Sequence, residues 1–150
     1  MHQDSAFVRV SSPLELAAWV ALEDVSAGSG ELEYFVGSHH LEDYLFEGRF
    51  KWMPFRSGEY EAFIQSLRER SQARGLERRR FLPRKGDALI WSADLVHGGS
   101  RDAQAGVTRK SLVTHYCPVA CSPAPDAVHP VGPRSRYAEG ALFTSQMRGV

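Results

Sequence analysis

Short apolar stretches, separated by turns rich in glycine, serine and aspartate, run through the first three quarters of the chain. Alternating or continuous apolar positions with many β-branched and aromatic side chains predict strands. We expect strands at 5–10, 18–25, 31–36, 88–91, 95–96 and 110–116. Strands this short, divided by such turns, are typical of a β-sandwich or barrel.

One segment has the period of a helix instead. Apolar side chains recur with i, i+3, i+4, i+7 spacing at positions 60, 63, 64 and 67, and charged side chains fill the other face. Ser57 is the expected N-cap and Gly75 the expected stop. From Pro118 onward the chain holds five of its eight prolines and no clear period, so we expect a loop there.

Composition narrows the class of protein. With 150 residues, 43% of them apolar, residues 1–150 have the size of one globular domain. Basic and acidic residues balance at 18 each, so bulk charge favours neither nucleic acid nor an anionic membrane as a partner. The longest uninterrupted apolar run, 16–22, is too short to cross a bilayer.

The N-terminal residues lack the basic and apolar regions of a secretory signal. Cys117 and Cys121 are too few for a disulfide framework, so we expect two thiols in a reducing cytoplasm. Residues 68–85 contain eight basic and two acidic side chains. We interpret them as the solvated end of the helix and its exit loop; the alternative is a surface for a phosphorylated or CoA-like substrate.

Three residues have the chemistry of a metal site. His2 and Asp4 are two apart, and on a strand such side chains share a face. His97 follows a predicted strand and precedes Gly98 and Gly99, which we expect to leave space for bulky ligands. Two histidines and one carboxylate make the facial triad of non-haem Fe(II) enzymes. The pattern therefore predicts an iron site.

Arg109, twelve residues after His97, adds a possible anion receptor. If 109–116 is a strand, Arg109, Ser111 and His115 share one face. A guanidinium and a hydroxyl two apart can grip a carboxylate through charge-assisted hydrogen bonds. A 2-oxo acid that chelates the metal at one end and meets Arg109 at the other would fit this set. His115 itself we interpret as a core or rim histidine, and Trp91 as a core residue.

These residues belong to a longer series of motifs. The series comprises His2-Gln3-Asp4, residues 19–25, residues 30–32 leading to 36–39, residues 85–87 before Trp91, residues 95–100, and Arg109. In this order the sequence resembles the iron- and 2-oxoglutarate-dependent oxygenases of the phytanoyl-CoA dioxygenase type. The resemblance covers roughly positions 2–118 and implies a double-stranded β-helix, or jelly roll.

The resemblance also implies roles. His2, Asp4 and His97 match the family's iron ligands, and Arg109 matches the residue that pairs with the distal carboxylate of 2-oxoglutarate. Trp19 matches an aromatic residue of the co-substrate pocket, and Gln3 stands where the family often has glutamine; Ser111 is added from strand parity alone. The implied activity uses O2 to hydroxylate an unactivated C–H of a small-molecule or acyl substrate, with succinate and CO2 as co-products.

Family members have a substantial segment before the first ligand, whereas here that ligand is residue 2. We therefore expect the chain to be the C-terminal portion of the family domain. Its jelly roll would be incomplete at the N-terminus, its iron binding weak, and its exposed sheet edge prone to self-association.

Two other functions stay open at this point. One is a non-redox metal-binding jelly roll of cupin type, against which the spacing of Arg109 from His97 argues. The other is a catalytically silent remnant, or a half-domain that depends on a partner.

Overall fold

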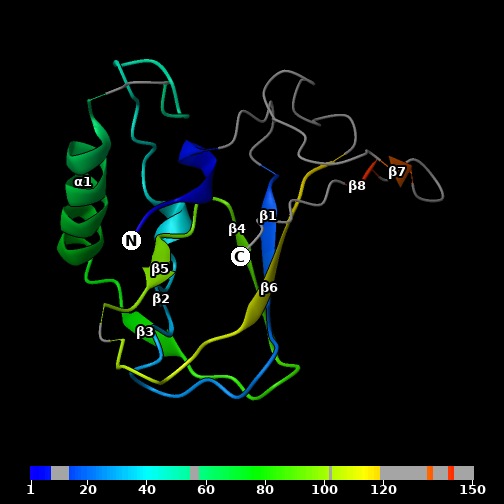
Figure 1. Cartoon of the computed structure of the whole chain (residues 1–150). Helices are drawn as coiled ribbons and strands as arrows, with labels where there is room; N and C mark the ends of the chain where they lie inside the picture. The colour runs from blue at the N-terminus through cyan, green and yellow to red at the C-terminus, as the bar shows by residue number, and fades with distance from the viewer. Residues whose placement is uncertain (8–13, 55–57, 102, 119–134, 137–141, 144–150) are drawn as a thin grey trace.

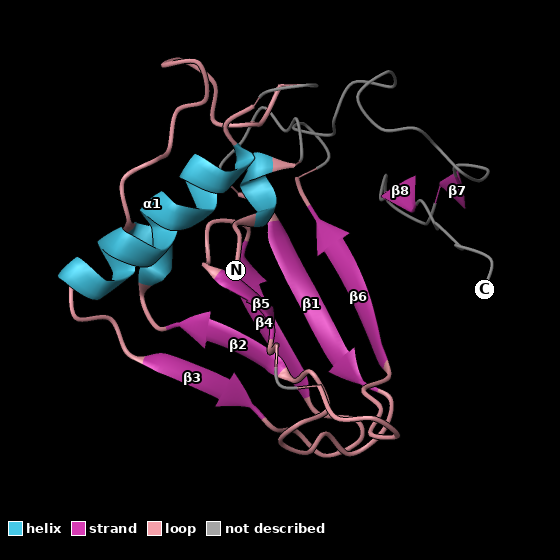
Figure 2. Ribbon diagram, turned by 60° about the vertical axis from the view of Figure 1, so that its left-hand side comes forward, coloured by secondary structure: helices cyan, strands magenta, loops and turns pink. Residues whose placement is uncertain are grey.

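The computed structural model describes residues 1–7, 14–54, 58–101, 103–118, 135–136 and 142–143. Its main elements form three layers, namely a helix, a small sheet and a larger sheet (Figure 1). The larger sheet has the order β4-β1-β6, formed by Ala88–Ser92, Leu16–Ala21 and Ser111–Tyr116. The small sheet has the order β3-β2-β5, formed by Arg78–Phe81, Leu32–Phe35 and His97–Gly99. Helix α1, Tyr60–Ala73, flanks the small sheet (Figure 2).

Of these six strands only β2 and β3 are both successive in the chain and in the same sheet. At every other step the chain crosses to the other sheet, and every pair within a sheet is antiparallel. This arrangement confirms the expected mainly β, jelly-roll fold. Two short 3-10 helices, η1 (Asp4–Ala6) and η2 (Ser38–His40), follow the N-terminus and β2. In the tail, β7 (Ser135–Arg136) pairs with β8 (Leu142–Phe143). No helix among the described residues is both long and apolar enough to cross a membrane.

One apolar core fills the space between the sheets. Its buried side chains come from both sheets and their connections: Ala17, Trp19, Ala21, Val25, Leu32, Trp91 and Leu95. Alternate residues of β1 face this core, which is why its burial alternates. A second core lies between the small sheet and α1, where Phe35 and Val96 meet Phe63 and Leu67 of the helix. Trp91 of the first core contacts one of the predicted metal-site residues, because its Nε1 donates to Asp4 Oδ2.

Several predicted boundaries are wrong. Residues 5–6 are not a strand, because the chain turns into η1 with Phe7 N donating to Asp4 O. β1 ends at Ala21 rather than at residue 25. The helix begins at Tyr60 after Glu59, whereas Ser57 lies outside the described residues; Gly75, with a φ of 63°, follows the helix end as expected.

The predicted exit loop contains a strand that the sequence pattern did not indicate. β3 is built from three arginines and Phe81, and it pairs along its whole length with β2. Glu33 of β2 is buried, and Arg78 and Arg80 both form ion pairs with it. Charge pairing across the strands therefore replaces the apolar alternation on which the prediction relied. In the tail, β7 and β8 also contradict the expected loop, while Cys121 lies outside the described residues.

Candidate metal and co-substrate site

The backbone brings the two histidines together. His2 N donates to His97 O at 2.7 Å and His97 N donates to His2 O at 2.9 Å, so the residues form an isolated antiparallel bridge. This pairing extends the small sheet at β5. Gly98 is needed for the close approach, because a Cβ there would lie 3.1 Å from the backbone N and Cα of Met1. The expectation that Gly98 and Gly99 leave space for bulky ligands stays a prediction.

Asp4 completes the cluster from the first turn of η1. Its Oδ1 lies 3.3 Å from His2 Nε2 and 3.5 Å from His97 Nε2. One donor atom from each of the three residues lies within 4.8 Å of the others. Asp4 and His97 are buried and His2 is half-buried, so the cluster is most open to solvent at His2. We call His2, Asp4 and His97 the ligand cluster; the sequence predicted all three.

The protonation states suit metal binding. Burial lowers the pKa of His97, although the charge of Asp4 opposes this shift. His97 Nδ1 lies 2.9 Å from Leu95 O, an arrangement in which Nδ1–H donates and Nε2 keeps its lone pair. Burial alone would raise the pKa of Asp4, but hydrogen bonds with His115 and His2 hold it well below its usual range. A carboxylate and a neutral imidazole are the forms that bind a metal ion.

Two residues whose interpretation was purely structural also contact Asp4. Trp91 Nε1 donates to Asp4 Oδ2 at 3.1 Å, and His115 Nε2 lies 3.3 Å from the same oxygen. The strand parity that groups His115 with Arg109 placed its side chain on this face, but nothing in the sequence indicated the contact with Asp4. No signal in the sequence distinguished Trp91, whose indole N–H contacts Asp4, from any other core tryptophan.

Arg109 lies just before β6, and its guanidinium packs against Gly99 of β5. A Cβ at Gly99 would lie 3.6 Å from Arg109 Nη1. That Nη1 is buried and has no hydrogen-bond partner among the described residues. An unpaired buried guanidinium nitrogen is costly unless an anion meets it. The arrangement therefore fits the carboxylate of a bound acid, two residues along β5 from His97.

The remaining predicted site residues lie near this region. Trp19 is buried between the sheets and makes an edge-to-face contact with Phe81, with ring centroids 5.7 Å apart. Ser111 opens β6 opposite Ala21. Gln3 Nε2 donates to Asp94 O at 2.6 Å, so in this structure its amide fixes the segment between the two ligands.

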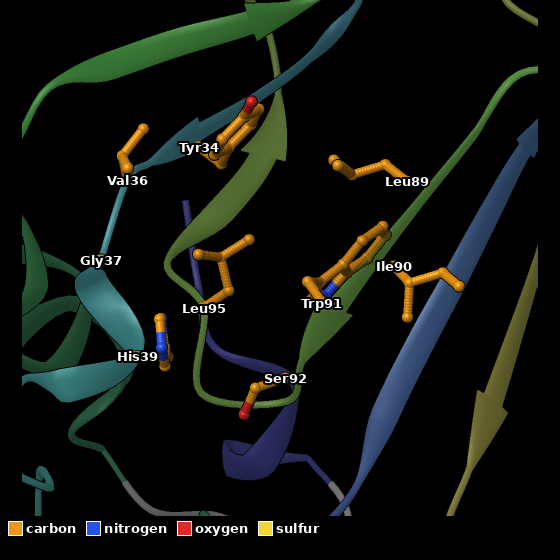
Figure 3. Close-up of a pocket in the computed structure, with 9 residues that line it drawn as sticks. All are labelled: Tyr34, Val36, Gly37, His39, Leu89, Ile90, Trp91, Ser92 and Leu95. Carbon is orange, nitrogen blue, oxygen red and sulfur yellow. The ribbon is translucent and has the colours of Figure 1, made fainter.

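Trp91, whose indole N–H contacts Asp4, also lines an apolar pocket (Figure 3). Its walls come from β2, η2 and β4 with their connections: Tyr34, Val36, Gly37, His39, Leu89, Ile90, Trp91, Ser92 and Leu95. Trp91 thus belongs both to the wall of this pocket and to the surroundings of Asp4.

Solved structures of similar fold include enzymes that depend on α-ketoglutarate. The non-heme α-ketoglutarate-dependent epimerase SnoN from nogalamycin biosynthesis is 26% identical, with a TM-score of 0.61 over 96% of this chain and 52% of SnoN. SnoN in complex with Fe3+, α-ketoglutarate and nogalamycin RO gives 25% identity and a TM-score of 0.59, covering 96% of this chain and 53% of SnoN. The chain thus spans about half the length of SnoN.

The carbocyclase SnoK of the same biosynthesis, also non-heme and α-ketoglutarate-dependent, supports the fold alone. It is 22% identical, with a TM-score of 0.51 over 76% of this chain and 40% of SnoK. Comparison with curated protein sequences gave no match. The sequence profile of phytanoyl-CoA dioxygenase (PhyH), in contrast, matches residues 1–110, which include the ligand cluster and Arg109. The chain therefore belongs to the phytanoyl-CoA dioxygenase family of iron- and 2-oxoglutarate-dependent enzymes.

Proposed function

We propose that the chain binds Fe(II) through His2, Asp4 and His97 and binds 2-oxoglutarate with Arg109. In this proposal it hydroxylates an unactivated C–H of a small-molecule or acyl substrate and releases succinate and CO2. Two observations together carry the proposal: three possible ligand atoms converge within 4.8 Å, and Arg109, which packs against Gly99 two residues after His97, has a buried guanidinium nitrogen with no partner among the described residues. Family membership supports the choice of iron and 2-oxoglutarate.

Each residue has a defined task in this reaction. Iron, 2-oxoglutarate and O2 together supply the oxidising power for C–H cleavage. The two histidines and Asp4 would hold the metal, and three protein ligands would leave coordination positions for the reactants. Arg109 orients the co-substrate by pairing with its distal carboxylate. Trp19 and Ser111 would complete that pocket, as the resemblance and strand parity predict, and Gln3 would support it from between the ligands.

Spectroscopy tests the metal site without knowledge of the substrate. Under anaerobic conditions, Fe(II) with 2-oxoglutarate should give a weak visible charge-transfer band. The band should vanish in Asp4→Ala and in His97→Ala, and it should persist in the control His40→Leu, because His40 is exposed and outside the ligand cluster. Persistence of the full band in both ligand variants would reject the assignment.

The co-substrate site is tested by Arg109→Ala. This change leaves the second carboxylate of 2-oxoglutarate unpaired, a loss of about 2–5 kcal/mol of binding free energy. Metal binding should survive, which separates the two sites. An unchanged affinity for 2-oxoglutarate would place the co-substrate elsewhere.

Product analysis identifies the reaction. Succinate release that requires 2-oxoglutarate would exclude a non-redox cupin and a silent remnant. Hydroxylation adds one oxygen atom to the substrate, whereas an epimerisation such as that of SnoN leaves the substrate mass unchanged. The mass of the product therefore decides between the two outcomes.

Self-association through a sheet edge is a further part of the proposal. β6 is the last strand of its sheet among the described residues, and Leu112, Val113 and Tyr116 are exposed along it. Exposed apolar edges template pairing with another chain. Leu112→Lys should lower the association measured by sedimentation. Association that is absent from the unaltered chain, or unchanged in the variant, would contradict this part.

A further inference from the structure

The two oxygens of Asp4 have different surroundings. Oδ1 faces the ring nitrogens of His2 and His97, at 3.3 and 3.5 Å. Oδ2 faces away from them toward the larger sheet, where Trp91 Nε1 and His115 Nε2 lie at 3.1 and 3.3 Å. The carboxylate thus has one oxygen directed to the ligand cluster and one oxygen held by two N–H groups.

We propose that Trp91 and His115 are positioning residues that hold Asp4 Oδ2, so that Asp4 binds the metal through Oδ1 alone. This inference rests on the proposed function, because it assumes a metal in the ligand cluster. Trp91 is suited to the task, because an indole N–H only donates and its ring is buried in the core between the sheets. It cannot compete with Asp4 for a metal.

His115 reaches Asp4 from the opposite edge of the larger sheet. It lies on β6 opposite Ala17 of β1, whereas Trp91 lies on β4 opposite the same Ala17. Ala17 is buried, and its methyl group is small. The two longer side chains on its flanks therefore share one face of the sheet and meet the same carboxylate oxygen.

A held Oδ2 has a chemical consequence. A carboxylate free to rotate can chelate a metal through both oxygens, and this would use a coordination position that the co-substrate or O2 needs. Hydrogen bonds from groups around a metal site orient its ligands, and removing such a partner typically lowers metal affinity about 10–100-fold. Because Trp91 and His115 hold the same atom, the two effects should not be additive.

Co(II) binding to the whole chain tests the proposal without enzymatic turnover. His115→Leu removes the donor, His115→Gln keeps an N–H on a side chain of similar reach, and Trp91→Phe keeps a ring but loses the N–H. We expect His115→Leu and Trp91→Phe to weaken Co(II) binding about tenfold each, with most of the affinity restored in His115→Gln. The control His40→Leu should bind as the unaltered chain does.

The visible spectrum of bound Co(II) supplies the readout that a merely structural role would not move. Loss of the donors should let Asp4 chelate through both oxygens, and the higher coordination number should weaken the d–d bands. Unchanged affinity and spectrum in His115→Leu and Trp91→Phe would overturn the positioning role while leaving the metal site intact. Failure of the unaltered chain to bind Co(II) would instead overturn the proposed function and this inference with it.

Discussion

Carboxylates are buried in two regions of this small domain, and their charges are compensated differently. On the small sheet, Glu31 and Glu33 of the β2 segment face Arg78 and Arg80 of β3; we call these four residues the glutamate–arginine ladder. Arg80 Nη1 lies 3.0 Å from Glu31 Oε1, and Arg80 Nε lies 3.1 Å from Glu33 Oε1. Arg78 forms an ion pair with Glu33 as well. In the ligand cluster, Asp4 has imidazole and indole nitrogens around it and no arginine or lysine within ion-pair distance among the described residues.

The difference separates structure from binding. A guanidinium is always charged, so the ladder neutralises its carboxylates permanently. Asp4 has no permanently charged partner among the described residues, and the ring nitrogens of His2 and His97 converge on the same small space as its Oδ1. A divalent cation would supply the missing positive charge. The comparison predicts that the ladder contributes stability and the ligand cluster contributes affinity.

Asp4→Ala should produce the largest effect on metal affinity and show that the ligand cluster and the ladder have separate roles. Without its carboxylate the cluster retains two imidazoles, and we expect affinity for Fe(II) or Mn(II) to fall more than about 100-fold. Glu33→Gln is the matched change in the ladder and should leave the affinity within a factor of about two. Calorimetric titration of both variants checks this. A comparable loss of affinity in both would show that the regions are not separate.

Arg80→Ala should give the opposite result. It leaves Glu31, which is fully buried, and Glu33 without a shared partner. Breaking a buried pair costs about 3–5 kcal/mol, and the exposure of Arg80, 43%, reduces our expectation to about 2–3 kcal/mol. Urea unfolding measures the loss, while metal affinity should not change. Unaltered stability would mean that water compensates the glutamates instead.

The fold was more predictable than its charged parts. Strands β1, β2, β4 and β6 lie within or close to their predicted ranges because apolar alternation fixed them. β3 was not predicted, because Arg78–Phe81 is stabilised by partners on another strand, which no local pattern encodes. For the same reason the contacts of Trp91 and His115 with Asp4, from 87 and 111 residues away, could not be predicted.

The ligand cluster itself was predictable, although part of the reasoning was wrong. Strand spacing was expected to place His2 and Asp4 on one face, but Asp4 belongs to η1. The residues converge because His2 pairs with His97 and the chain then turns. Residue type and order along the chain carried the prediction, whereas the local conformation came from contacts that are distant in sequence.

A smaller effect should separate the two glycines after His97. Gly98→Ala would place a methyl group 3.1 Å from the backbone of Met1 and displace the segment that carries His2, so we expect metal affinity to fall about 3–10-fold. At Gly99 the nearest atoms are 3.5 Å or more from a Cβ, an ordinary contact distance. Gly99→Ala should therefore leave metal affinity unchanged. Equal losses in titrations of the two variants would contradict this account.

The smallest expected effect is a pH dependence specific to the ligand cluster. The hydrogen bond with Asp4 raises the pKa of His115; burial opposes this shift, and the charges of Asp4 and Glu15 add to it. A raised folded-state pKa means that the stabilisation is complete below about pH 6.5 and is lost as pH rises through the folded-state value. Because His115 is 44% exposed, we expect less than about 1 kcal/mol. Comparing unfolding of the unaltered metal-free chain and His115→Gln across pH 6–9 would isolate this contribution; identical curves would refute it.

The bridge between His2 and His97 links metal exchange to the opening of the backbone. In the proposed metal site each residue would supply a ligand nitrogen, and in the structure it shares two backbone hydrogen bonds with the other. If His2 left the metal because the segment that carries it moved away from β5, both hydrogen bonds would break in the same event. A bound cation would then hold the segment that carries His2 against β5. It would slow the deuterium exchange of the His2 and His97 amides and couple the lifetime of the metal complex to the lifetime of two backbone hydrogen bonds.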